Sequence, residues 1–205
     1  MIGFYNYTVI LTYLGLASGM MGIISAVQGK ITAAILCLLL AGFFDMFDGL
    51  VARTKKDRTK QEKCFGIQLD SLSDVICFGV LPAMIGYAVG LNTWYFYIIL
   101  ILYVLAALIR LAYFNVTEEE RQEQTSDVRK EYLGLPVTSA ALIIPLIYVF
   151  ILCLKSNFYL LYAATLLIVA FAFLAKFKIK KLKLKGMIAV LIIGIIELAV
   201  LLICH

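Results

Sequence analysis

The sequence predicts an all-α protein, a polytopic bundle of transmembrane helices. Of its 205 residues, 63% are hydrophobic and only 15% are charged, and the mean hydropathy is +0.99. A water-soluble domain cannot solvate so much apolar surface, so the solvent for most of the chain must be a bilayer. Apolar runs recur along the whole chain, separated by short polar stretches. We therefore expect a single membrane domain over residues 1–205.

The chain contains seven apolar runs, each close to the length of about 20 residues that a helix needs to cross the hydrocarbon core. They cover residues 8–28, 31–51, 67–90, 93–115, 135–154, 158–175 and 187–204. The first run lacks a preceding basic segment and a following cleavage site, so we expect it to stay as a span and not to be removed as a signal peptide. Longer polar stretches lie at residues 53–63, 116–132 and 176–185. The last of these alternates lysine with apolar residues, which indicates a strand-like or interfacial segment.

The basic residues lie almost entirely on one side of the expected bundle. If the N-terminus is cytoplasmic, all three polar stretches face the cytoplasm, and so does the inner end of the fourth run. Only Lys30 and Lys155 of the 18 Lys and Arg residues are then outside, as the positive-inside rule requires. This topology, with attraction to anionic lipid headgroups, accounts for the net charge of +5, so no nucleic-acid partner is expected.

Histidine and cysteine offer little chemistry. The only histidine is His205, the last residue, so acid–base catalysis by histidine is not expected. The five cysteines are odd in number, lie mostly within apolar runs and lack the spacing of a zinc site. Cysteine in such runs behaves as a small hydrophobic residue, so a disulfide framework is not expected either.

Four aspartates lie within the apolar runs, where a charged side chain is costly and by default marks a functional site. Asp45 and Asp48 are near the end of the second run, and Asp70 and Asp74 near the start of the third. On a helix the first pair is separated by roughly 60° and the second by about 40°, so each pair shares a face. Antiparallel packing of the two runs would bring all four carboxylates together. Such a cluster needs cations, and oxygen ligands favour hard ions such as Mg²⁺ or Mn²⁺.

Small and basic residues follow the first aspartate pair. Gly49 and Ala52 leave space beside the carboxylates for a diphosphate and a nucleotide, and Arg53 has the geometry to bind phosphate. Each also has a simpler explanation, because small residues permit close helix packing and an arginine can mark the inner membrane boundary. Their combination with four intramembrane aspartates favours the functional interpretation.

The spacing of these residues resembles the signature of the CDP-alcohol phosphotransferase family. The matching positions are Asp45, Asp48, Gly49, Ala52, Arg53, Gly66, Asp70 and Asp74. Twelve residues separate Arg53 from Gly66, more than is usual in the family, and we expect them to lengthen the cytoplasmic loop. The resemblance implies a core of six spans, here with one more, and a homodimer in the cell membrane with its active site facing the cytoplasm.

The family resemblance also implies a reaction and roles for these residues. An alcohol attacks the lipid-bearing phosphorus of a CDP-activated lipid, and CMP leaves. Two divalent ions are implied, with Asp45 and Asp70 contacting both, Asp48 completing one and Asp74 the other. Asp74 is also the implied general base. The implied CDP-lipid-binding residues are Gly49, Ala52, Arg53 and Gly66.

Segments around the aspartates resemble the family members that use serine as the acceptor, the phosphatidylserine synthases. These segments are residues 69–83, 110–116 and 134–136. The implied substrates are CDP-diacylglycerol and L-serine, within a surrounding of membrane lipids. Arg110 is the candidate for binding the serine carboxylate, with Asn115 and Ser71 as weaker polar candidates. Arg110 could equally be a snorkelling anchor, and the polar pair could serve only local hydrogen bonding.

Two alternatives stay open. The first keeps the chemistry and changes the acceptor to glycerol 3-phosphate, inositol phosphate or choline. The second is a small cation transporter that uses the aspartates as a transport site, although this leaves Gly49, Ala52 and Arg53 unexplained. Other acidic residues receive no chemistry: Glu197 is expected to have a packing or lipid-facing role, and residues 118–123 to form a solvated loop.

Overall fold

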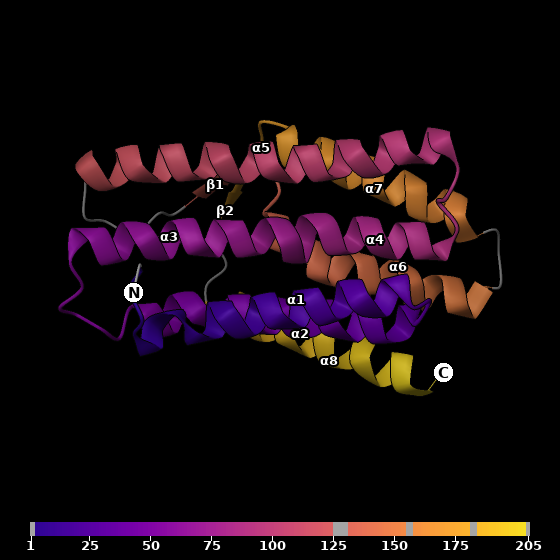
Figure 1. The fold of residues 1–205 in the computed structure, drawn as a ribbon, viewed down its shortest axis with the longest axis horizontal. Coiled ribbons are helices and arrows are strands. Elements are labelled where there is room, and N and C mark those ends of the chain that lie inside the picture. The colour runs from indigo at the N-terminus through magenta and orange to yellow at the C-terminus, as the bar shows by residue number, and fades with distance from the viewer. Residues whose placement is uncertain (1–2, 125–130, 155–157, 181–183, 204–205) are drawn as a thin grey trace.

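The computed structural model describes residues 3–124, 131–154, 158–180 and 184–203, and most of them are helical (Figure 1). The α-helices are α1 (Ile10–Val27), α2 (Ile31–Ala52), α3 (Lys60–Asp74), α4 (Leu81–Val89), α5 (Trp94–Gln124), α6 (Ala140–Leu154), α7 (Phe158–Leu174) and α8 (Leu184–Ile203). A π-helical segment, η2 (Val75–Val80), joins α3 to α4, so the three form one continuous rod. Single 3-10 turns, η1 (Tyr7–Val9) and η3 (Val137–Ser139), precede α1 and α6.

The expected helical membrane bundle is confirmed. Four segments are long and apolar enough to cross a membrane: Tyr7–Val27, Ile31–Ala52, Lys60–Val89 and Trp94–Arg121. Shorter apolar helices cover Val137–Phe150, Tyr159–Leu174 and Gly186–Leu201. Each predicted run is therefore helical within the described ranges, and α8 ends at the opposite end of the bundle from the start of α1 (Figure 1). The crossing of the bilayer by all seven, and the cytoplasmic N-terminus, stay predictions.

The third span begins earlier than its apolar run, which starts at residue 67. Thr59 is the N-cap of α3: its side chain accepts a hydrogen bond from the Glu62 N–H, and the Glu62 carboxylate accepts one from the Thr59 N–H. This capping box starts a helix in a polar segment that hydropathy alone assigns to a loop. Of the twelve residues between Arg53 and Gly66, the last six therefore belong to α3, and the first six form the turn between α2 and α3.

The acidic stretch 118–123 is also not the loop that was predicted. It continues α5 as far as Gln124, because glutamate, glutamine and arginine are good helix formers and an existing helix extends without a new nucleus. Arg121 Nε donates a hydrogen bond to Glu118 Oε2 at 3.0 Å, one turn away. As a result α3 and α5 both project past α1 and α2 at one end of the bundle (Figure 1).

A short antiparallel ribbon connects two polar stretches. β1 (Glu131–Leu133) pairs with β2 (Lys178–Lys180), and Tyr132 lies opposite Ile179. This pairing accounts for part of the alternating lysine stretch at residues 176–185, which the sequence predicts to be strand-like or interfacial. Residues 181–183 of that stretch lie outside the described ranges.

Small residues allow α1 to pack closely against its neighbours. A Cβ added to Gly19 would lie 2.6 Å from Cys77 Sγ of η2, and one added to Gly22 would lie 2.8 Å from Leu81 Cδ2 of α4. Both distances are shorter than van der Waals contact, so glycine sets how near α1 comes to the α3–η2–α4 rod. Close approach through small residues is typical of helix pairs in membranes. It places α1 beside the segment that follows the second aspartate pair.

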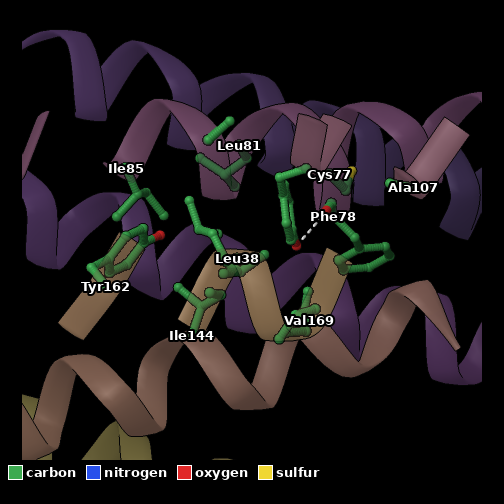
Figure 2. Packing of buried hydrophobic residues seen from close by; sticks show 14 of the residues in the cluster. Leu38, Cys77, Phe78, Leu81, Ile85, Ala107, Ile144, Tyr162 and Val169 are labelled. Carbon is green, nitrogen blue, oxygen red and sulfur yellow. Dashed lines mark hydrogen bonds between the residues drawn. The ribbon is translucent and has the colours of Figure 1, made fainter. Parts of the chain in front are cut away.

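The apolar core fills the space between the rod and the helices α2, α5, α6 and α7. Figure 2 shows Leu38 of α2, Leu81 of α4, Ile144 of α6 and Tyr162 of α7 meeting in one cluster. All four are fully buried. The core therefore packs helices from the first half of the sequence against helices from the second half.

Two tyrosines satisfy backbone groups within this core. Pro82 has no N–H to offer the Phe78 carbonyl one turn earlier, and Tyr103 Oη donates to that carbonyl at 2.9 Å. Tyr162 Oη donates to the Pro82 carbonyl at 2.8 Å. Buried polar groups without partners are costly, so these hydroxyl groups stabilise the junction between η2 and α4.

Candidate active site

Three aspartates from two helices converge in a small recess between α1, α2, α3 and η2. A carboxylate oxygen from each of Asp45, Asp70 and Asp74 lies within 4.8 Å of the other two. Asp45 comes from α2, and the other two lie one turn apart on α3. Three convergent carboxylates are an oxygen donor set that suits a hard divalent cation. The buried side chains of Cys77 and Phe78 also line the recess.

Asp48 lines the same recess but has a different set of neighbours. Its side chain is buried, and Thr12 Oγ1 of α1 donates to Asp48 Oδ2 at 3.1 Å. The Asp48 carboxylate is also within hydrogen-bonding range of Asp70. Sequence analysis assigned Thr12 no role, because a threonine in an apolar span usually bonds its own backbone. Only the packing of α1 against α2 reveals this contact.

Ionised carboxylates gathered in this recess repel one another. Two like charges about 4 Å apart repel by roughly 4 kcal/mol at the effective dielectric constant of a site near a protein surface. A hydrogen bond to a charged group returns only about 1.5–3 kcal/mol, so the Thr12 contact cannot offset the repulsion among four carboxylates. A bound cation can. The donor set and its electrostatics therefore fit a divalent metal ion.

The four residues expected to bind the CDP-lipid have two kinds of surroundings. Gly49 and Arg53 are exposed, and a Cβ added to Gly49 would meet nothing within 4 Å. Helix packing therefore does not explain the glycine at this position. Ala52 and Gly66 instead border Arg58, whose Nη1 donates to the Ala52 carbonyl at 3.3 Å. A Cβ added to Gly66 would lie 2.6 Å from Arg58 Nη2.

Two of the three candidates for serine binding are in contact. Ser71 Oγ donates to Asn115 Oδ1 at 2.7 Å, and Asn115 Nδ2 donates to Gln68 Oε1 at 3.1 Å. This chain of polar groups links α3 to α5. Gln68 carries no sequence signal, since it is one polar residue among several in its stretch.

Arg110 is buried in the bundle, at 7% exposure. A snorkelling arginine keeps its guanidinium in water, so this burial argues against the explanation of Arg110 as a surface anchor. Its guanidinium carbon lies 6.0 Å from the centroid of the Phe114 ring, on the same helix. The distance is at the outer limit of a cation–π interaction.

Comparison with known proteins decides the family. The family model described as CDP-alcohol phosphatidyltransferase matches residues 5–202. The chain belongs to the CDP-alcohol phosphatidyltransferase family. The resemblance inferred from the spacing of aspartates, small residues and arginine is thereby confirmed, and it extends into the last helices, where sequence analysis found little.

Several curated relatives have related names. The CDP-diacylglycerol–serine O-phosphatidyltransferase of Saccharomyces cerevisiae is 36% identical over 147 residues, which are 67% of this chain and 52% of that protein. The archaetidylserine synthase of Methanothermobacter thermautotrophicus is 37% identical over 140 residues, 68% of this chain and 56% of that protein. The CDP-diacylglycerol–serine O-phosphatidyltransferase of Bacillus subtilis is 30% identical over 126 residues, 60% of this chain and 64% of that protein. The chain thus spans about half the length of the first two relatives.

Proposed function

We propose that this protein transfers a phosphatidyl group from CDP-diacylglycerol to L-serine, which yields phosphatidylserine and CMP. The observation that carries the proposal is the convergence of Asp45, Asp70 and Asp74 from two helices in a chain of this family. Serine is supported as the acceptor because the names of all three relatives above contain it. The names differ in the lipid, so the choice of diacylglycerol follows the yeast and Bacillus relatives.

The proposed reaction is one displacement at phosphorus. The serine hydroxyl oxygen forms a bond to the phosphorus that carries the lipid, the bond from that phosphorus to the bridging oxygen breaks, and CMP leaves with the electron pair. Asp74, buried in the recess, accepts the hydroxyl proton. A carboxylate is a weak base toward an alcohol, so it takes this proton only as the new bond forms. Positioning of the two substrates therefore supplies much of the rate enhancement.

The four aspartates are the proposed ligands of two divalent ions, Mg²⁺ or Mn²⁺. When bound, such ions neutralise the diphosphate and the charge that develops on the departing CMP. Thr12 fixes one oxygen of Asp48 and so limits the orientations of that carboxylate. Gly49 leaves the backbone of α2 open to the substrate, and the exposed Arg53 is placed to bind phosphate.

We also propose that the site faces the cytoplasm from the cell membrane and that the protein is a homodimer, as the family resemblance implies. The turn between α2 and α3 holds several basic residues and lies at the same end of the bundle as the start of α1 (Figure 1). This position supports a cytoplasmic site through the positive-inside rule.

The deciding experiment measures CMP release by the purified protein with CDP-diacylglycerol, a divalent ion and one alcohol at a time. L-Serine should support release, while glycerol 3-phosphate, inositol phosphate and choline should not. Release with glycerol 3-phosphate and none with serine would overturn the choice of acceptor. Metal flux in proteoliposomes without any dependence on CDP-lipid would instead favour the transporter.

A further inference from the structure

Arg58, in the turn between α2 and α3, fills the space between two signature positions. Its Nη1 donates to the Ala52 carbonyl at 3.3 Å, and its Nη2 donates to the Glu62 carbonyl at 3.0 Å. The same Nη2 occupies the place where a side chain on Gly66 would begin, since a Cβ atom there would lie only 2.6 Å from it. One guanidinium group therefore touches both helices that carry the aspartates.

The charge of Arg58 is not neutralised by a carboxylate in the described part of the chain. The ion pairs there join Lys55 to Glu62 and Arg121 to Glu118. Arg58 contacts the backbone carbonyl of Glu62, but the Glu62 carboxylate accepts hydrogen bonds from Lys55 Nζ at 2.8 Å and from the Thr59 N–H at 2.8 Å. This contact with Glu62 raises the pKa of Lys55. The Glu62 carboxylate is thus occupied by one other cation, Lys55, and by neutral donors from Thr59 and Asn6.

Arg58 also has an unused hydrogen-bond donor. Its Nε is buried and has no hydrogen-bond partner among the residues that the structure describes. Backbone carbonyl groups satisfy two of its nitrogens but carry no net charge, and a buried donor without a partner destabilises a fold. Phosphate oxygens match the planar fork of a guanidinium and bind it more strongly than neutral acceptors do.

We propose that Arg58 binds the diphosphate of the CDP-lipid, and that position 66 is glycine because the Arg58 guanidinium needs the space. The proposal rests on the proposed function, in which a CDP-lipid reaches the aspartates. In the substrate-free protein the two backbone carbonyl groups hold the guanidinium between α2 and α3. When the diphosphate arrives, its oxygens replace one or both carbonyl groups as acceptors. A cation already held near its ligand loses less conformational entropy on binding than the exposed Arg53 does.

Steady-state kinetics of Arg58→Gln and Arg58→Lys test this role. Arg58→Gln should raise KM for CDP-diacylglycerol by about 10-fold or more, the loss expected for a charge-assisted contact, while KM for the acceptor stays within about twofold. Arg58→Lys should recover part of the loss, because it restores the charge without the fork. Lys56→Gln is the matched control, since it removes an exposed charge from the same turn. A fall in kcat alone, or an equal change in both KM values, would overturn the proposal.

A double-mutant cycle tests the pairing of Arg58 with Gly66. Gly66→Ala alone should raise KM for CDP-diacylglycerol as Arg58→Gln does, because the new methyl group displaces the guanidinium. In the Arg58→Gln background the glutamine side chain is shorter and does not reach position 66. Gly66→Ala should therefore change KM for CDP-diacylglycerol little further. Effects that multiply independently would show that Gly66 serves another purpose, and would overturn the pairing.

Direct binding separates this inference from the proposed function. Thermal stabilisation by CDP-diacylglycerol in detergent should be strong in the wild type and weak in Arg58→Gln, whichever alcohol the protein uses. Binding that depends on Arg58 without any serine-dependent CMP release would overturn the choice of serine and leave the Arg58 inference standing. The same assay in vesicles of zwitterionic lipid, with and without phosphatidylglycerol, identifies the source of the phosphate. A defect that appears only with phosphatidylglycerol would assign Arg58 to bilayer phosphate and overturn the proposal.

Discussion

The aspartate recess and the apolar core are built from the same elements but bury opposite kinds of groups. α2 contributes Asp45 and Asp48 to the recess and Leu38 to the core, and the α3–η2–α4 rod likewise contributes to both. In the core, each tyrosine hydroxyl described above has a carbonyl acceptor. In the recess, carboxylates face carboxylates. The core therefore stabilises the fold. The carboxylates of the recess destabilise it, and they are retained because function requires them.

Glu197 of α8 extends this comparison to an acid that stands alone. It is buried, at 4% exposure, and neither carboxylate oxygen has a hydrogen-bond partner in the described ranges. Of the two roles expected for it, the structure excludes exposure to lipid and leaves packing within the protein. A single buried carboxyl group becomes neutral by binding one proton, whereas a cluster of four also provides the convergent oxygens that hold a metal ion.

Neutralising one acid of the recess should have the largest effect, a loss of activity without a loss of stability. Asp70→Asn should lower CMP release by about 10³-fold, as expected when a group that stabilises charge in the transition state is lost. The melting temperature measured in EDTA should stay the same or rise, because one of four repelling charges is gone. Added Mn²⁺ should stabilise the wild type and not the variant. Asp57→Asn, an exposed aspartate in the α2–α3 turn, is the control and should behave as wild type.

Shortening a side chain of the apolar core should give the opposite result, a loss of stability without a loss of activity. Leu38→Ala removes a fully buried side chain and should lower the free energy of unfolding by about 2–4 kcal/mol, measured by thermal or denaturant unfolding in detergent. CMP release per folded molecule should be unchanged. Leu40→Ala, on the same helix but 47% exposed, should cost little. A tenfold loss of activity per folded Leu38→Ala molecule would show that the two regions are not separable.

The Thr12 contact supports one aspartate of the recess, and its loss should have an intermediate effect. Thr12→Val keeps the shape of the side chain and removes the hydrogen bond to Asp48. We expect turnover to fall about tenfold, since hydrogen bonds to charged groups contribute about 1.5–3 kcal/mol. Thr12→Ser should retain most of the activity in the same CMP assay. Equal loss in both variants would mean that the methyl group of Thr12, and not its hydroxyl, matters.

Removing one core hydroxyl should have the smallest effect. Tyr103→Phe leaves the Phe78 carbonyl without the donor that replaces the missing Pro82 N–H. The free energy of unfolding should fall by about 1 kcal/mol, with no change in turnover. Unfolding measured side by side with Tyr162→Phe checks the expectation, because the two hydroxyl groups act on neighbouring carbonyl groups. An unchanged stability in both variants would show that the π-helical junction satisfies these carbonyl groups by itself.

Sequence reasoning succeeds here where a feature repeats along the chain and fails where it depends on contacts between helices. The apolar runs locate the α-helices of the described ranges, because a span needs a set length of apolar residues. The aspartate spacing indicates the recess, because residues three or four apart share one face of a helix. Hydropathy does not predict the start of α3 at Lys60, because the helix begins at a capping box and not at an apolar residue. Sequence analysis assigned no role to Thr12, Gln68 and Arg58, because an isolated polar residue does not reveal which helix it will face.

The π-helical segment η2 has a consequence for exchanging parts between members of this family. Its N–H···O=C bond from Leu81 to Ile76 spans five residues, so the segment holds one residue more than an α-helical turn would. That residue rotates everything after it by about 100°, which directs Asp74 to the recess and Leu81 to the core. A chimera that replaces η2 with a regular α-helix must therefore also lose one residue between these two positions. If it kept that residue, Leu81 would turn to the face of the rod that carries Asp74.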